Sequence, residues 1–502
     1  MSIAVECGIM ETLLNGHVHL EVTAHPAPSR TTRPRTALIA APEHHPDELF
    51  LPPRLILDDM LRAQKIEARL SGLVLSGPTL RRICDVFHRE VEAGLRQEPS
   101  SLLMENTYVP ELPDGTEEGL FLALDLGGTN FRVLLLELHN GVLVREDVKQ
   151  YHISDELRLA PAEDLFNYLA DCVLDFVTSE GMEKEELSLG FTFSFPMKMH
   201  SISSGELTTW TKSFKCGGME GVDVAALLQR CLHERNLRVT VRVLLNDTTG
   251  TLVAGAHTNH DVGIGMILGT GSNGCYMERA ERVQHWEAEH SRVRDVCVNV
   301  EWGAFGDNGC IDFVRTDIDR EVDARSLLAT SFTFEKYIGG KYLGEVLRAS
   351  LAALAREGLF PAEPVNLVTA DISAIEEDWV EGGTARTLRV LRQSLAKDAD
   401  VSLTLSDAIV AQHVARLIST RAAQLVAVCV ATLLRRIARP HVSVAVDGSV
   451  YKRHPRIRHL MPRYIARLAP NHPFTLFDAE DGSGKGSALT AAIAARIAAR
   501  EN

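Results

Sequence analysis

The chain has 502 residues, of which 45% are hydrophobic and 24% are charged, so two or three domains with a sizeable core are expected. The net charge of −15 and the lack of a long basic cluster argue against nucleic acid as a partner. Nine scattered cysteines without a CxxC pair argue against a disulfide framework or a zinc site and indicate a reducing compartment.

Residues 1–54 are predicted to form a flexible leader, because proline is frequent from about Ala24 to Pro53. The leader could carry a docking signal, such as one for the mitochondrial surface, although its composition favours a plain disordered tail. No signal peptide is evident, and the longest apolar stretch, Leu425 to Leu434, is too short to span a membrane. We therefore expect a cytosolic protein with no transmembrane segment, and we expect it to be monomeric.

Folded structure is expected from about Leu55, with a first helix that Thr79 caps and that places apolar residues at a period near 3.6. Strand signals then recur at 121–126, 131–138, 142–148, 187–195, 238–245, 263–268, 274–278, 296–301, 442–447 and 474–478. Helical patterns lie between them at 161–178, 222–235, 248–257, 335–355, 406–437 and 486–500. This interleaving predicts an α/β fold with a mixed sheet.

The segment Leu122–Arg132 predicts a strand, a tight glycine turn and a second strand. Gly127 and Gly128 would let the backbone approach a ligand closely and point amide groups at it. Asp125 would lie at the end of the strand, where it could act on a cation or a water. Such a hairpin can hold nucleotide phosphates, but taken alone it is as readily an ordinary turn.

The segment Val243–Gly250 predicts a buried strand that runs through Asn246 and Asp247 into a helix. Ligands gather at the carboxyl ends of strands in open α/β sheets. Asp247 could accept a proton from an alcohol that Asn246 holds. Taken alone, however, the segment favours Asp247 as the N-cap of the helix.

A second glycine hairpin, Gly265–Asn273, repeats the layout of the first, which suggests two related halves that face one ligand. The segment Val444–Ser449 offers a further strand and Gly-Ser turn. By contrast, Asp481–Ser487 only resembles a P-loop, because Ala479 and Gly486 occupy positions where that motif needs glycine and Ser or Thr. We interpret it as a glycine-rich turn between a strand and a helix.

Side chains able to hold a polyol follow several of these segments, and they are Thr211, Lys212, Asn273, Glu301 and Glu335. A polyhydroxyl ligand needs many such partners, because each buried hydroxyl left unpaired costs about 1–3 kcal/mol.

Together these segments resemble the motif set of the eukaryotic-type hexokinases, glucokinase included. The resemblance runs in the family's order from about Leu55 to the C-terminus. It rests on Leu124–Arg132, Gly190–Pro196, Trp210–Lys212, Asn246–Asp247, Gly269–Asn273, Glu301–Gly306, Ile338–Lys341 and Val446–Lys452.

The resemblance implies an actin-like ATPase fold (ribonuclease H-like) with two lobes, mixed sheets flanked by helices, and a central cleft. The small lobe would span 55–248 and the large lobe 249–502, with the last helix packing back on the small lobe. The implied activity is phosphorylation of the 6-hydroxyl of glucose and related hexoses by ATP with Mg2+, the first step of glycolysis.

The resemblance also implies roles for individual residues. Asp247 would be the general base, and Lys212 would offset charge on the transferred phosphoryl group. The sugar site would comprise Ser194, Thr211, Lys212, Asn246, Asp247, Asn273, Glu301 and Glu335. The nucleotide and its phosphates would contact Asp125, Gly127, Gly128, Thr129, Asn130, Arg132, Thr270, Gly448 and Ser449. No residue would bind the metal directly, since ATP would carry Mg2+, with a water link to Asp125.

The chain departs from the family pattern at Ser213, where glycine is usual, and at Gly274, where alanine is usual. Ser272 matches the general hexokinase pattern rather than vertebrate glucokinase, and Thr404–Ser406 matches too poorly to assign a nucleotide contact. Two other functions stay open, a catalytically silent hexose sensor or scaffold and an actin-like ATPase that drives assembly. The hexose preference is also open.

Overall fold

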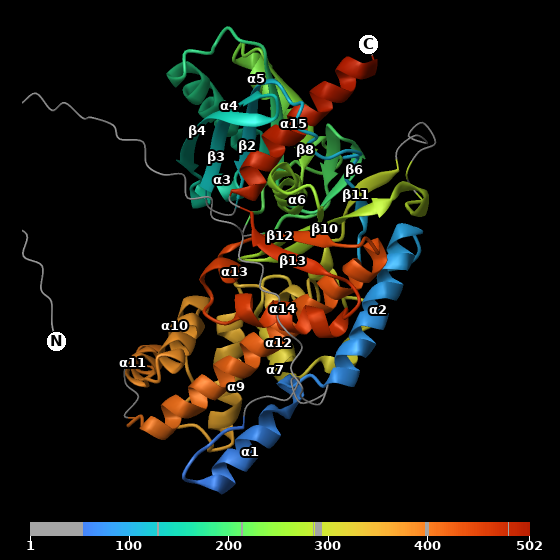
Figure 1. Ribbon diagram of the computed structural model, residues 1–502. Helices are drawn as coiled ribbons and strands as arrows, with labels where there is room; N and C mark the ends of the chain where they lie inside the picture. The colour runs from blue at the N-terminus through green and yellow to red at the C-terminus, as the bar shows by residue number, and fades with distance from the viewer. Residues whose placement is uncertain are drawn as a thin grey trace, which may run out of the picture. The chain divides into compact units, whose positions relative to one another are not determined.

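The computed structural model describes residues 54–127, 130–211, 214–284, 286, 294–396, 401–479 and 481–501 (Figure 1). The predicted leader, apart from Arg54, lies outside the described residues. Two β-sheets organise the described part of the chain into two lobes. A two-stranded hairpin, β6 (Met197–Ser201) with β7 (Ser204–Leu207), accompanies the first lobe.

The sheet of the first lobe has five strands in the order β4-β3-β2-β5-β8. Their bounds are β2 (Gly119–Leu126), β3 (Asn130–His139), β4 (Val142–His152), β5 (Leu187–Phe193) and β8 (Val239–Leu245). The β2, β3 and β4 strands form an antiparallel meander, whereas β5 and β8 run parallel to β2. The helices of this lobe are α3 (Asp155–Leu159), α4 (Ala162–Ser179) and α5 (Val224–Glu234). Residues of α4 and α5 form one hydrophobic core with the sheet.

The sheet of the second lobe has six strands in the order β1-β11-β10-β9-β12-β13. Their bounds are β1 (Glu105–Asn106), β9 (Val262–Leu268), β10 (Ser272–Arg279), β11 (Asp295–Asn299), β12 (Val442–Asp447) and β13 (Phe474–Asp478). Without β1, this order matches that of the first sheet strand for strand, including the antiparallel meander and the two parallel strands. The two halves inferred from the glycine hairpins therefore share one topology.

In each sheet, the last strand along the chain is followed by a helix that lies in the core between the lobes. These are α6 (Asp247–Thr258), which follows β8, and α15 (Gly482–Glu501), which follows β13 (Figure 1). Glycines bring the two helices together: a Cβ on Gly486 would lie 2.0 Å from the carbonyl oxygen of Gly250. A glycine also allows α15 to pack closely on the first sheet, because a Cβ on Gly190 would lie 2.0 Å from the carbonyl oxygen of Ser487.

The segment Asp481–Ser487, interpreted from the sequence as a turn, is in fact helical from Gly482. Its glycines serve close helix packing rather than a change of chain direction. The predicted helix 335–355 is also interrupted, as α8 (Glu335–Ile338) and α9 (Leu343–Arg356). Gly339 leaves the helical conformation, and the N–H of Gly340 donates to the carbonyl of Gly269 at 2.8 Å, which docks this turn on the second glycine hairpin.

The remaining helices belong to the core of the second lobe. They are α1 (Met60–Leu70), α2 (Gly77–Leu95), α7 (Asp317–Arg325), α10 (Thr369–Val380), α11 (Ala385–Ser394), α12 (Leu405–Ile437), α13 (Ser449–Arg453) and α14 (Ile457–Leu468). Within the described residues, α12 alone is long and apolar enough to cross a membrane, but 94% of its most apolar window is buried inside the protein. It packs as a central core helix.

The N-terminal helices correct two expectations. The residues from Leu55 to Met104 pack in the hydrophobic core of the second lobe, so a boundary at 248 does not separate the two lobes. The N-cap of α2 is Ser76 rather than Thr79: its hydroxyl accepts from the N–H of Thr79 at 3.2 Å. The last helix, α15, packs on the first sheet.

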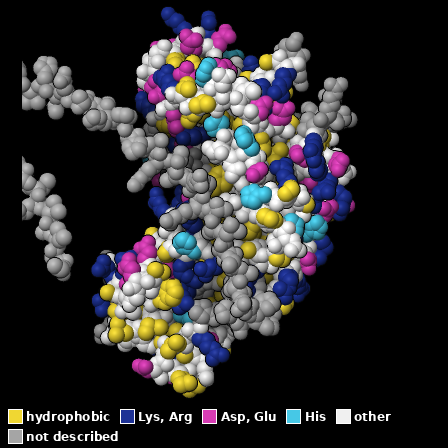
Figure 2. Space-filling view, viewed as in Figure 1, with side chains coloured by type: hydrophobic (Ala, Val, Ile, Leu, Met, Phe, Trp, Pro, Cys, Tyr) yellow, Lys and Arg dark blue, Asp and Glu magenta, His cyan; other side chains and the backbone are white. Residues whose placement is uncertain are grey.

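Charged side chains of both signs are interspersed over the face shown in Figure 2. The excess of acidic residues in the sequence is therefore not gathered into one acidic patch on this face.

Candidate active site

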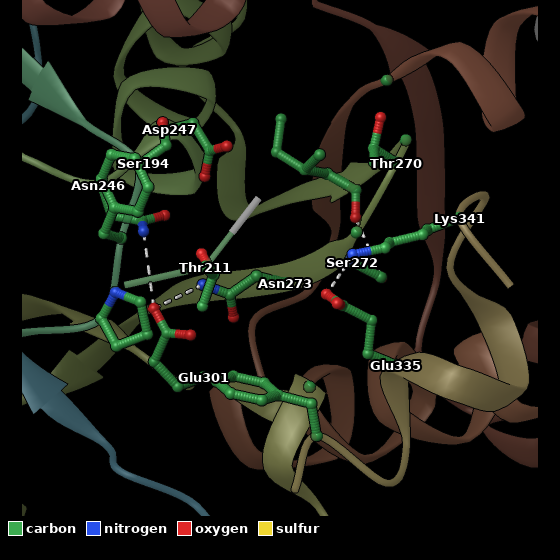
Figure 3. Close-up of a pocket in the computed structure, with 18 of the residues that line it drawn as sticks. Ser194, Thr211, Asn246, Asp247, Thr270, Ser272, Asn273, Glu301, Glu335 and Lys341 are labelled. Carbon is green, nitrogen blue, oxygen red and sulfur yellow. Dashed lines mark hydrogen bonds between the residues drawn. The ribbon is translucent and has the colours of Figure 1, made fainter. Parts of the chain in front are cut away.

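A cavity of about 580 Å³ is lined by residues from both lobes. Most of the residues assigned from the sequence to sugar, and several assigned to nucleotide, share this cavity. They are Ser194, Thr211, Asn246, Asp247, Thr270, Asn273, Glu301, Glu335, Gly448 and Ser449. Figure 3 shows that the labelled polar side chains surround one space, although they come from distant parts of the sequence.

Asp247 occupies the first turn of α6 and lines the cavity. Its neighbour Asn246 is the N-cap, since its Oδ1 accepts from the N–H of Thr248 at 3.0 Å and from the Thr248 hydroxyl at 2.9 Å. The view of Asp247 as the cap is therefore wrong. Because Asn246 satisfies the helix terminus, the Asp247 carboxylate can serve the cavity, toward which it points in Figure 3.

Glu301 accepts hydrogen bonds from amide side chains. Its Oε1 accepts from Nδ2 of Asn299 at 2.7 Å, of Asn273 at 3.0 Å and of Asn246 at 3.5 Å. Two of these bonds are visible in Figure 3. Amide donors on one carboxylate oxygen fix the rotamer of Glu301 and hold the carboxyl group where it can accept from ligand hydroxyls.

The second glycine hairpin brings Glu335 into the site. Glu335 Oε2 accepts from the N–H of Ser272 at 3.1 Å, and a Cβ on Gly271 would lie only 2.4 Å from that oxygen. Glycine is thus needed for the carboxylate to reach the turn. The N–H of Lys341 donates to the carbonyl of Thr270 at 2.8 Å, so the loop after α8 closes over the same turn.

An aromatic cluster holds the contribution of the first lobe. Phe195, which follows Ser194, lies edge-on to Trp210 and Phe214 with ring centroids 4.9 and 5.2 Å away. Trp210 stacks on Phe214, and Thr211 lies between them in the chain. These contacts fix the two segments that carry Ser194 and Thr211 into the cavity. The predicted catalytic Lys212 lies outside the described residues.

The first glycine hairpin is only partly described. Gly128 and Thr129 lie outside the described residues, as does the side chain of Asn130. The described residues of this set, Asp125, Gly127 and Arg132, do not line the cavity. Their assignment to the nucleotide stays a prediction.

Asp125 is buried and accepts hydrogen bonds from the Arg132 guanidinium and from the Ser483 hydroxyl. Arg132 also pairs with Asp481, at the start of α15. Burial opposes the charge of Arg132, but the two carboxylates outweigh it and raise the pKa of the guanidinium above its usual range. In this arrangement the pair ties the first hairpin to α15.

Several cavity residues were missed from the sequence, namely Arg158, Leu328, Phe332, Lys341 and Tyr342. Lys341 ends a quoted motif, so its place in Ile338–Lys341 was a usable signal. Burial, and then the Glu335 carboxylate, raise the pKa of Tyr342 to about 12, so its phenol keeps its proton at neutral pH. Nothing in their local sequence patterns distinguishes Leu328 and Phe332 from ordinary core residues.

Two family models, both described as hexokinase, match residues 65–257 and 263–493. Human hexokinase-2 is 36% identical over 457 residues, which cover 87% of this chain and 49% of that protein. Mouse hexokinase-1 is 39% identical over 454 residues, covering 86% and 46%. The chain spans about half the length of the curated relatives it matches.

A solved structure titled as hexokinase from Schistosoma mansoni complexed with glucose superposes with a TM-score of 0.80 at 35% identity. The match covers 87% of this chain and all of that one. The predicted two-lobed, actin-like α/β fold is thereby confirmed.

Proposed function

Because the chain belongs to the hexokinase family, we propose that it transfers a phosphoryl group from ATP to the 6-hydroxyl of glucose and related hexoses. The observation that carries the proposal is the shared cavity. Three groups of residues line this cavity. They are the Asp247 carboxylate, a set of amides and carboxylates suited to sugar hydroxyls, and a glycine hairpin beside Lys341. The glucose complex of the Schistosoma mansoni relative supports a hexose as the ligand class.

Asp247 orients the reacting hydroxyl and takes its proton as the new bond to phosphorus forms. Asn246, Asn273, Glu301 and Glu335 bind the other hydroxyls and set the position of the ring. Phosphoryl transfer needs little covalent chemistry from the protein, so this positioning supplies much of the catalysis. The cavity lies between lobes, and lobe closure on the sugar would exclude water as a competing acceptor.

The nucleotide end of the cavity fits phosphate. The hydroxyls of Thr270 and Ser449 and the ammonium of Lys341 belong to its wall, and they suit phosphate oxygens. Among the described residues no group of three or more His, Cys, Asp or Glu is placed to hold a metal ion. Mg2+ would be held by the ATP phosphates, where it would neutralise their charge, and Thr270, Ser449 and Lys341 would face that complex.

The test is a coupled kinase assay over glucose, fructose, mannose and glucosamine, with wild-type protein and Asp247→Ala. We expect hexose-dependent ADP release from the wild type and a loss of about 10²–10⁴-fold in the variant, as is typical for a missing general base. The control is Asp261→Ala, an exposed position in the second lobe that lies outside the cavity. Wild-type ATP hydrolysis that is independent of sugar, or near-normal turnover by Asp247→Ala, would contradict the proposal.

We further propose that the enzyme works in the cytosol as a monomer. The described cysteines are all free, and all but Cys310 are buried, which suits a reducing compartment. Cell fractionation and light scattering on the purified chain test these two points.

A further inference from the structure

Asn299 is a buried amide behind the candidate sugar site. It ends β11, two residues before Glu301, and is 7% exposed. Unlike Glu301 and Asn273, it does not line the cavity of the candidate active site. Its side chain nevertheless contacts both of these residues.

Both ends of the Asn299 amide are engaged. Its Nδ2 donates to Glu301 Oε1 at 2.7 Å, and its Oδ1 accepts from Asn273 Nδ2 at 2.8 Å. Asn273 Nδ2 also donates to Glu301 Oε1 at 3.0 Å, which closes a triangle of three side chains. If the Asn299 amide were flipped, its oxygen would face the Glu301 carboxylate and its nitrogen would face Asn273 Nδ2. The three side chains therefore allow only one orientation of this amide.

The hydrogen bond from Asn273 to Asn299 also bears on the orientation of the Asn273 amide. Since Asn273 Nδ2 is directed at Asn299 and Glu301, its Oδ1 is directed at the N–H of Gly274, at 2.7 Å. The Asn299 amide therefore helps to fix the orientation of the Asn273 side chain, together with Glu301 and the N–H of Gly274. The Thr248 hydroxyl of α6 lies 3.4 Å from Asn299 Oδ1, but its shorter contact, of 2.9 Å, is with Asn246 Oδ1.

Glu301 needs such support because its backbone is strained. Its φ of 55° lies in the left-handed region, which is unfavourable for a residue with a Cβ. The N–H of Val300 donates to the carbonyl of Gly274 at 2.9 Å, and the Asn299 amide fixes the side chain that follows. The strained backbone and the amide together aim one carboxylate at the cavity.

We propose that Asn299 is a positioning residue for the hexose. It holds Glu301 and Asn273 in the geometry that binds sugar hydroxyls, without touching the sugar. The inference rests on the proposed function, because it assigns the two side chains to a hexose.

The test is Asn299→Asp, which keeps the shape and the acceptor for Asn273 but sets a second carboxylate oxygen against Glu301. We expect the KM for glucose to rise about 10- to 100-fold, as when a hydrogen bond to a charged group is lost, with the KM for ATP changed less than about twofold. Asn299→Ser removes the amide without adding charge and carries the same expectation, should the aspartate variant fail to fold.

The matched control is Asn106→Asp on β1, the strand paired with β11. Asn106 is fully buried, and its Nδ2 has no hydrogen-bond partner within the described residues. It shares the cost of a buried Asn-to-Asp change, and its Oδ1 accepts from the N–H of Tyr108 at 2.9 Å instead of from a residue of the triangle. We expect a lower melting temperature and an unchanged KM for glucose.

A double-mutant cycle with Glu301→Gln separates positioning from a merely structural role. If Asn299 acts through Glu301 and Asn273, Asn299→Asp weakens glucose binding less in the Glu301→Gln background than in the wild type, measured by calorimetry without turnover. Additive losses, or an unchanged KM in Asn299→Asp, would overturn the inference. A wild-type chain that fails to phosphorylate any hexose would instead overturn the proposed function.

Discussion

Asn246 performs two tasks with the two ends of one amide. Its Oδ1 caps α6, and its Nδ2 reaches toward Glu301. One side chain therefore contributes both to the stability of α6 and to the candidate sugar site. A suitable substitution can remove one contribution and leave the other.

Asn246→Ala removes both contributions, whereas Asn246→Ser keeps a capping oxygen, loses the amide donor and adds no charge beside Glu301. We expect the free energy of unfolding to fall by about 1 kcal/mol in the alanine variant, the usual value of an N-cap, and to fall less in the serine variant. Both variants should raise the KM for glucose. Urea denaturation measures the stability and steady-state kinetics measure the KM, and equal destabilisation by Ala and Ser would refute the capping role.

At this scale the sequence singled out residues that share one cavity, but not the buried residues behind them. Asp247, Glu301 and Glu335 each follow a recognisable turn or motif, and the structure brings them to one cavity. Asn299 ends a buried strand with an ordinary pattern, so only the fold reveals its contact with Glu301. Asp125 and Arg132 have the expected motif, but they contact each other and the start of α15.

The contact between α6 and α15 is too close for a side chain at Gly486. Gly486 meets the backbone of Gly250, where no side chain can move aside. Both helices lie in the core between the lobes, so their spacing affects both sheets.

Gly486→Ala is expected to destabilise the fold by about 1–3 kcal/mol, because overpacking here can be relieved only by shifting a helix. Gly217→Ala is the matched control, since a Cβ there meets nothing within 4 Å. Guanidinium denaturation of the two variants checks the expectation. Equal stability would show that α15 can move away from α6 at no cost.

Among the elements, the strands of the two main sheets other than β1 were predicted, β13 with its exact bounds, whereas the helices α1, α7, α10, α11 and α14 were not. Both meanders and α12 follow from the alternation of apolar runs and turns. The β6–β7 hairpin was missed because each strand is short, and the start of α15 was missed because its glycines resemble a turn. In that helix, tertiary packing overrides the low helix propensity of glycine.

For the whole molecule, Glu105 is a link between the lobes. It belongs to β1 of the second sheet, and its Oε1 accepts from the N–H of Met199, on the hairpin of the first lobe, at 2.7 Å. Burial raises the pKa of Glu105 to about 7, against the opposing effects of that N–H, Lys198 and His200.

This pKa makes stability depend on pH. Below pH 4.5 the carboxyl of Glu105 is protonated in the folded and unfolded chains alike. Between pH 4.5 and about 7 the unfolded chain releases the proton first, so the folded state loses stability as pH rises. Glu105→Gln removes this loss, so its stability relative to the wild type should rise by about 3 kcal/mol between pH 4.5 and 7.5.

Denaturation of both proteins across this pH range measures the difference, and the exposed Glu183→Gln serves as control. A gap between Glu105→Gln and wild type that does not change with pH would refute the assigned titration.

The place of α15 has a consequence for biosynthesis. The first sheet is complete once residue 245 has left the ribosome, but one of its apolar faces is covered by residues 482–501. Until that helix emerges, the nascent first lobe presents a bare hydrophobic surface to the cell. Chaperone capture during translation should therefore persist until the final helix is made, however early the five strands pair.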